Sequence, residues 1–179
     1  MSDAGVLGIR RATDADWPAL WAIMEPVVRV GETYCWDTCL SEAQARTEWL
    51  APADRTMCVF VAEETPGPGS VGAAVGAVVG TAQLHANRAG GGSHVANASF
   101  MVAGNAGGRG VGRLLARHVL AEAREQGYRA MQFNAVVETN TRAVRLWQSL
   151  GFRTLATAPG AFRHPAEGFV GLHIMFREL

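Results

Sequence analysis

The spacing of apolar residues predicts two helices in the first part of the chain. Over residues 15–30 apolar side chains recur every three or four positions, which is the period of a helix with one buried face. That face comprises Trp17, Leu20, Trp21, Met24, Val27 and Val28. The Thr-Asp pair at 13–14 offers a cap for this helix. Ser41 with Gln44 resembles a capping box for a second helix that ends near Leu50.

Short apolar runs between turn residues predict a group of antiparallel strands. The expected strands are 8–12, 57–63, 72–85 and 94–103, with turns at 64–71 and 89–93. The turns are rich in glycine and, at 64–71, proline, which interrupt regular structure. Strands joined in this way form hairpins, so the first half of the chain is expected to build an antiparallel half-sheet.

The second half alternates helix and strand. Apolar positions 111, 114, 115, 119 and 120 predict a helix over 111–126, which Gly127 is suited to end. A strand over 129–138 follows. Because a strand, a helix and a strand form a crossover unit, 94–103 and 129–138 are expected to lie parallel and adjacent.

A fourth helix and a last hairpin complete the expected order. The helix starts at Thr139 or Asn140 and ends at Gly151. Strands 152–157 and 168–177 then form a hairpin. The long loop expected between them contains Pro159, Gly160 and Pro165.

Composition narrows the classes of protein. With 179 residues, 49% hydrophobic and 18% charged, the chain is expected to form one domain over residues 1–179. Sixteen basic and sixteen acidic residues leave no basic field, so neither nucleic acid nor a membrane is an expected partner. No apolar stretch is long enough to span a bilayer and no secretory signal is visible, which predicts a cytoplasmic protein.

Cysteine and histidine give no sign of a disulfide framework or a metal site. Cys35, Cys39 and Cys58 are odd in number, which favours reduced thiols. The five histidines show no ligand spacing, so no metal is expected.

A glycine-rich loop is the strongest candidate for chemistry. The apolar run 98–103 leads into Gly104, Gly107, Gly108, Gly110 and Gly112, and the helix starts at 111. Unhindered backbone N–H groups at a helix N-terminus bind phosphates, and Arg109 and Arg113 add positive charge. No Lys-Ser/Thr follows, which excludes the P-loop pattern. The alternative is an ordinary surface loop before a helix.

The continuation decides between these readings. After Gly-Val-Gly-Arg-Leu-Leu at 110–115 comes a strand, and then Asn-Thr-Arg-Ala-Val-Arg-Leu-Trp-Gln-Ser-Leu-Gly-Phe at 140–152. This order resembles the GCN5-related N-acetyltransferases (GNAT), in layout over residues 8–177 and in motif detail over 94–152. The resemblance implies an α/β fold of the α+β kind. Its mixed, mostly antiparallel sheet has seven strands and about four helices, and parallel strands four and five splay apart.

The resemblance also implies acetyl-CoA as co-substrate, with its pyrophosphate on the glycine loop and its pantetheine arm beside strand four. The residues it assigns to the coenzyme are Met101, Val102, Ala103, Gly107, Gly108, Arg109, Gly110, Val111, Gly112, Arg113, Asn140, Ala143 and Trp147. A backbone N–H of Met101 or Val102 is the expected donor to the thioester oxygen. For Asn140 the alternative is a helix cap.

Two positions depart from the family pattern. The family loop usually opens with Arg or Gln where this chain has Gly107, a loss for which Arg109 is expected to compensate. Many members have a Tyr acid where this chain has Trp147. An indole N–H donates hydrogen bonds but is no practical acid, so packing in the helix is the favoured interpretation of Trp147.

A narrower resemblance suggests the acceptor. Residues 93–98, 133–137 and 138–140 with Trp147 are similar to a subgroup that contains fungal N-acetyltransferases of proline analogues such as azetidine-2-carboxylate. It implies that Asn97 and Asn134 contact the substrate. The alternative is that the two asparagines satisfy each other or the backbone.

Three further residues are candidates for the acceptor site. Glu138 at the mouth of the wedge is a candidate to draw a proton from the amine through water, and the alternative is a solvated strand end. Tyr34 and Trp36 are expected to roof the acceptor pocket, with aromatic packing as an equal reading.

The sequence therefore predicts an N-acetyltransferase that moves an acetyl group directly from acetyl-CoA to a small-molecule amine in a ternary complex. The expected acceptor is an amino acid or a toxic amino-acid analogue. The alternatives are a protein or antibiotic N-acetyltransferase and a non-catalytic acyl-CoA sensor. A homodimer is compatible with the neutral, apolar-rich composition.

Overall fold

The computed structural model describes residues 6–50, 57–65 and 76–179. Within these ranges the strands are β1 (Val6–Arg11), β2 (Cys58–Thr65), β3 (Ala77–Ala86), β4 (Val95–Val102), β5 (Ala130–Val137), β6 (Arg153–His164) and β7 (Gly168–Glu178). The α-helices of the same ranges are α1 (Trp17–Val30), α2 (Glu42–Leu50), α3 (Val111–Glu125) and α4 (Thr141–Ser149).

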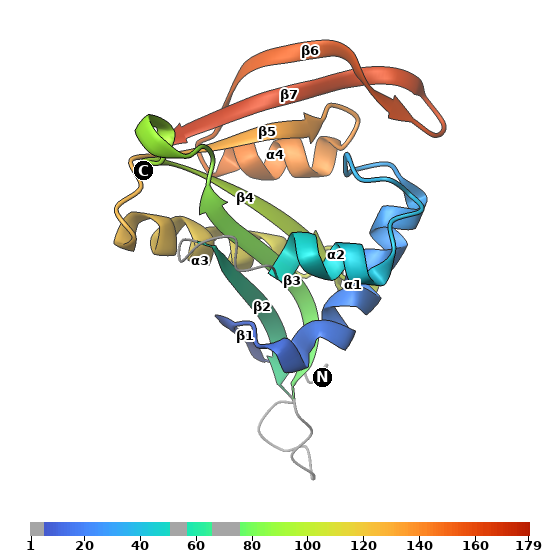
Figure 1. Ribbon diagram of the computed structural model, residues 1–179, viewed down its shortest axis with the longest axis vertical. Helices are drawn as coiled ribbons and strands as arrows, with labels where there is room; N and C mark the ends of the chain where they lie inside the picture. Colours follow the sequence, from blue (N-terminus) through green and yellow to red (C-terminus); the bar gives the residue numbers. More distant parts are fainter. Residues whose placement is uncertain (1–5, 51–56, 66–75) are drawn as a thin grey trace.

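The described strands form one sheet in the order β1-β2-β3-β4-β5-β7-β6. All neighbours are antiparallel except β4 and β5. That parallel pair is short: only Val95 with Ala130 and Ala96 with Met131 are in register, after which the strands separate. Figure 1 shows β5, β7, β6 and α4 at one end of the molecule and β1–β4 fanning out at the other. The predicted mixed sheet with splayed strands four and five is confirmed.

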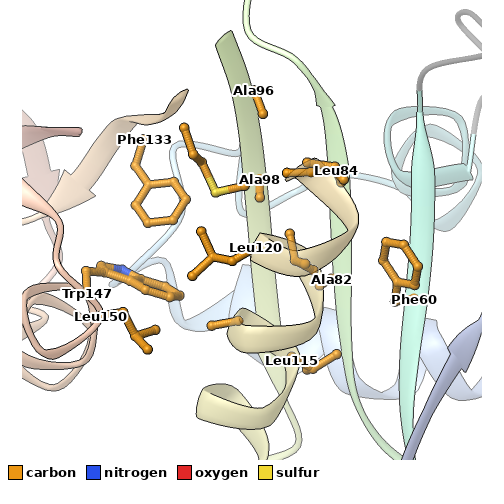
Figure 2. Close-up of a cluster of buried hydrophobic side chains, with 14 of the residues drawn as sticks. Phe60, Ala82, Leu84, Ala96, Ala98, Leu115, Leu120, Phe133, Trp147 and Leu150 are labelled. Atoms are coloured by element: carbon orange, nitrogen blue, oxygen red, sulfur yellow. The ribbon is translucent and has the colours of Figure 1, made fainter. Parts of the chain in front are cut away.

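Helices cover both faces of the β1–β4 half because its strands alternate apolar side chains between the two faces. Phe60 packs in a cluster with Leu115 and Leu120 of α3, whereas its neighbour Val61 packs with α1 and α2. Figure 2 shows the first cluster, which continues past α3 to Trp147 on α4. The site described below lies where this cluster meets the gap between β4 and β5.

The predicted helix starts are confirmed by their capping bonds. Ser41 Oγ accepts from the Gln44 N–H at 3.3 Å, and Gln44 Oε1 accepts from the Ser41 N–H at 3.0 Å. At the first helix Thr13 forms the same kind of box with Asp16, around a short 3-10 turn at 14–16 that precedes α1. Both helices are thus anchored at the ends where the chain leaves the sheet or the connecting loop.

The prediction of a loop around Pro159 and Gly160 is wrong, because β6 runs through these residues. Ala158 pairs with Leu172 and Phe162 with Val170, so three residues of β6 oppose one of β7. This wide bulge tolerates a proline, which has no N–H to donate, and Gly160 takes up the bend with φ of 61°. Residues read as a loop signal are therefore accommodated inside an edge strand.

Some predicted elements fall outside the described residues. These are the turn at 66–71 and the start of the third strand at 72–75. Glu64 and Thr65, which were expected in the turn, belong to β2.

Candidate active site

The backbone of β4 presents alternate residues to the gap. At one end Ala103 N–H donates to Val79 O at 2.9 Å, and at the other Asn87 N–H donates to Val95 O at 2.7 Å. Odd-numbered residues of β4 therefore pair with β3, because bonding alternates along an antiparallel strand. The N–H and C=O groups of the even-numbered residues at 98–102 point the other way, toward the side that β5 has left.

This alternation separates the two candidate donors to a thioester. Met101 lies opposite Thr81, so its N–H faces β3. The N–H of Val102 faces the gap. The donor role expected of either residue is therefore kept for Val102, while Met101, 2% exposed, packs with α1 and α2.

The side chain of Tyr34 bonds the backbone N–H and C=O of Phe100, the residue that precedes Met101 and Val102. Its hydroxyl accepts from Phe100 N–H at 3.0 Å and donates to Phe100 O at 2.8 Å. Burial of the hydroxyl raises the pKa of Tyr34 far above its ordinary value. The loop after α1 is in this way fixed to the gap. Trp36 packs against Tyr34 with ring centroids 5.7 Å apart.

A cavity of about 740 Å³ runs from this point over the glycine loop. We call it the loop cavity; it is lined by residues 100–104, 106–108, 110–113 and 140–143, together with Val27, Thr33, Tyr34, Arg145, Leu146 and Trp147. Gly108 and Gly110 have φ of 83° and 85°, and a Cβ at either would point into open space. Successive N–H groups in such a turn, at the N-terminus of the 15-residue α3, fit a diphosphate.

The arginines around the loop cavity are not equivalent. Arg109 forms an ion pair with Glu64 of β2 and does not line the cavity. Arg113 lines it and donates to Ser149 Oγ at 3.0 Å. Arg142 and Arg145, on α4, also line it and were not among the predicted coenzyme residues. The sequence feature that could have revealed these two arginines is their position, three residues apart and close to Asn140 in the motif.

A second cavity, of about 290 Å³, meets the loop cavity at Tyr34 and Phe100. We call it the asparagine cavity because Asn97 and Asn134 both line it. Its other lining residues are Thr33, Cys35, Trp36, Ala98, Ser99, Phe133, Ala135, Val136, Val137, Asn140, Ala143 and Trp147. The structure thus brings the predicted acceptor residues to one place, next to the gap in the sheet.

Within the described ranges, the hydrogen bonds of Asn97 and Asn134 leave side-chain N–H groups of both residues available. Asn97 Oδ1 accepts from Ala98 N–H at 2.8 Å, which turns its Nδ2 away from that bond. Asn134 Oδ1 accepts from Gln132 Nε2 at 2.8 Å, and Asn134 Nδ2 donates to Asn87 Oδ1 at 2.7 Å. An amide nitrogen has two hydrogens, so each side chain keeps at least one donor for a ligand.

Trp147 and Asn140 stand where the two cavities join. Trp147, 7% exposed, packs against Phe100 and Phe133 with centroid distances of 4.9 and 4.7 Å, and Figure 2 shows it beside Phe133. Asn140 caps α4, with Oδ1 accepting from Ala143 N–H at 3.2 Å. Packing and capping therefore account for the positions of both residues, and both still line the two cavities.

Glu138, like Arg109, is a predicted site residue that lines neither cavity. The Oε1 of Glu138 accepts from Gly171 N–H of β7 at 2.7 Å, at the residue opposite the bulge of β6. Asn87 and Gln132, which contact Asn134, were missed because their residue types alone do not reveal a partner on another strand.

Comparison with known proteins identifies the family. A model described as the acetyltransferase (GNAT) family matches residues 17–152. The chain belongs to the GNAT family. A solved GCN5-related N-acetyltransferase from Kribbella flavida is 50% identical, with a TM-score of 0.88 and coverage of 97% of this chain and 98% of that one.

Two further GNAT relatives bear on the chemistry. The N-acetyltransferase aca1 of Schizosaccharomyces pombe is 30% identical over 152 residues, which are 82% of this chain and 72% of the relative. The structure of yncA from Salmonella typhimurium, with its cofactor acetyl-CoA, is 25% identical, has a TM-score of 0.78 and covers 97% of this chain and 94% of that one. This GNAT protein is accordingly an acyl-CoA-dependent N-acyltransferase with acetyl-CoA as co-substrate.

The described part of the chain has neither a metal-binding cluster nor a membrane-spanning helix. In the ranges that the structure describes, no group of three or more His, Cys, Asp or Glu side chains is arranged to hold a metal ion. No helix in the same part of the GNAT chain is long and apolar enough to cross a bilayer.

Proposed function

We propose that this enzyme transfers the acetyl group of acetyl-CoA to the amine of a small molecule that also has a carboxylate, namely an amino acid or an amino-acid analogue. The observation that supports this acceptor is the pair of side-chain amides in the asparagine cavity, whose oxygens are engaged while N–H groups stay available. Amide N–H donors suit a carboxylate, which only accepts hydrogen bonds.

The chain's residues would hold the two reactants at the junction of the cavities. The thioester lies in the gap beside β4, where Val102 N–H can donate to its oxygen as charge develops. The acceptor amine approaches from the asparagine cavity. Holding the two reactants in this geometry is where most of the acceleration arises, on the order of 7–11 kcal/mol for well-oriented groups.

Direct transfer is favoured over a covalent enzyme intermediate. Of the three cysteines only Cys35 lines the asparagine cavity. Partial burial raises the pKa of the Cys35 thiol, which keeps it protonated and weakly nucleophilic. The amine therefore attacks the thioester itself, and the proton that it loses is available to the leaving thiolate. Trp147 supplies no acid for this step.

Thiol release with a panel of acceptors tests the proposal. The panel contains proline analogues, phosphinothricin-like compounds, polyamines, an aminoglycoside and a peptide with a free N-terminus. We expect turnover with the amino-acid analogues and a rise in acceptor KM for Asn97→Ala and Asn134→Ala. Turnover only with the peptide or the aminoglycoside would overturn the proposed acceptor in favour of a protein or antibiotic acetyltransferase.

A control with amide derivatives tests whether the enzyme recognises the carboxylate of the acceptor. Amides of the active amino acids, in which the carboxylate is neutralised, should be poor acceptors for the wild-type enzyme and insensitive to Asn97→Ala. Equal turnover of acids and amides would remove the carboxylate from the proposal.

A further inference from the structure

The space over Gly107 is filled by a side chain from another element. A Cβ at Gly107 would lie 3.1 Å from Arg142 Nη1 and 3.5 Å from Nη2. Gly107 itself has φ of −61° and ψ of 139°, which any residue can adopt, so backbone strain does not require a glycine here. A Cβ would also lie 3.3 Å from Gly104 O, so a side chain at 107 would crowd both this carbonyl and the guanidinium that lies above it.

Arg142 is placed to act on an anion in the loop cavity. It extends from the first turn of α4 and lines the cavity together with Gly107, Gly108 and Gly110. Among the described residues no hydrogen bond or ion pair engages its guanidinium. Arg109, the expected substitute for the missing loop side chain, is instead held by Glu64 outside the cavity.

We propose that Arg142 is the cationic ligand of the coenzyme diphosphate and replaces, from α4, the side chain that the loop lacks at position 107. A guanidinium offers paired N–H donors that match two oxygens of a phosphate group. The N–H groups of the loop approach the diphosphate from α3 and Arg142 approaches it from α4. The bound coenzyme thereby joins the two helices across the splayed strands.

Isothermal titration of desulfo-coenzyme A against the purified enzyme tests this binding without turnover. We expect Arg142→Ala to raise Kd by about 10- to 100-fold, the range for a lost hydrogen bond to a charged group. Arg142→Lys should lose part of this affinity, because a lysine cannot bind two oxygens with a planar fork. Arg117→Ala, which removes the same charge from an exposed site on α3, is the matched control and should leave Kd unchanged.

A second coenzyme analogue shows which phosphate group Arg142 contacts. The coenzyme has a 3′-phosphate as well as its diphosphate, and 3′-dephospho-coenzyme A retains only the latter. The ratio of variant to wild-type Kd should be the same for both ligands. A loss that disappears with the dephospho ligand would place Arg142 on the 3′-phosphate and overturn the proposal.

A positional swap provides the sharpest test. Gly107→Arg in the wild-type background brings two guanidinium groups into one space and should weaken binding. The same substitution combined with Arg142→Ala should restore most of the affinity lost in Arg142→Ala alone. Equal Kd values for wild type and Arg142→Ala, or an unrescued double variant with an unchanged melting temperature, would overturn the inference.

Discussion

The hydroxyl of Tyr34 bonds both backbone groups of Phe100, accepting from its N–H at 3.0 Å and donating to its C=O at 2.8 Å. A neighbouring strand would normally supply these two bonds, but β5 has already left β4 at this point. One side chain from the loop after α1 thus takes the role of a strand partner, at the place where the loop cavity meets the asparagine cavity.

Removing this hydroxyl should destabilise the protein. Tyr34→Phe retains the ring but leaves the Phe100 N–H and C=O without their partner, which costs about 1–3 kcal/mol. Urea unfolding at pH 7 measures the loss. Identical unfolding midpoints and slopes for wild type and variant would contradict this account of the contact.

The same pair predicts how stability depends on alkaline pH. The pKa of Tyr34 is raised in the folded protein, so the folded state keeps a proton that an unfolded tyrosine loses near pH 10. The stabilisation is complete below that pH and declines as pH rises further. The difference in unfolding free energy between wild type and Tyr34→Phe should therefore shrink above about pH 10. A difference that stays constant between pH 8 and pH 11 would rule this out.

Particular elements show what the sequence could predict. The capped helix α1 and the crossover through α3 follow from local periodicity, because each buries one face against the sheet. The path of β6 does not, since Pro159 and Gly160 signal a loop unless it is known that β6 itself bulges at these residues against β7. The motif resemblance pointed to the loop that lines the loop cavity. The position of the Arg142 guanidinium above Gly107 could not be predicted, because it depends on how closely α4 approaches the loop before α3.

Glu138 is expected to be dispensable for proton transfer. Its carboxylate is bound to Gly171 N–H and lines neither cavity, so Glu138→Gln should keep kcat and its pH profile. A glutamine oxygen still accepts from that N–H, which limits any structural effect. A fall in kcat of about 100-fold or more, with loss of the acidic limb of the profile, would instead identify Glu138 as a general base.

Asp16 should govern stability in acid. Arg10 donates to both of its carboxylate oxygens, at 2.7 and 2.8 Å, and these bonds, with those from Thr13, hold the pKa of Asp16 far below its usual range. That contribution is present above about pH 4, the unfolded pKa, and is lost as pH falls below it.

Asp16→Asn tests this relationship. Because Arg10 is partly exposed, we expect a modest cost of about 1–3 kcal/mol at pH 7. The cost should diminish toward pH 2, because there the Asp16 carboxyl of the unfolded wild-type chain takes up a proton that the folded state binds only at lower pH. Denaturant unfolding at several pH values measures both effects, and a cost that does not vary with pH would contradict the assignment.

Asn87 should orient Asn134 for the acceptor. Its Oδ1 accepts from Asn134 Nδ2 at 2.7 Å, while Gln132 Nε2 bonds Asn134 Oδ1, so the two neighbours determine which way the amide faces. On the proposed function, Asn87→Ala should raise acceptor KM by about 2- to 10-fold, with the Kd of desulfo-coenzyme A unchanged. Asn87→Asp retains the accepting oxygen and should retain most of the affinity.

Gln132→Glu is the complementary change. It places an accepting oxygen against Asn134 Oδ1, which favours the reversed amide and withdraws the N–H from the acceptor. Steady-state kinetics should therefore show a higher acceptor KM for Gln132→Glu than for wild type. If Asn134→Ala raises acceptor KM but Asn87→Ala and Gln132→Glu do not, Asn134 binds the acceptor without help from these neighbours. If none of the three does, the carboxylate lies elsewhere and the proposed acceptor site is wrong.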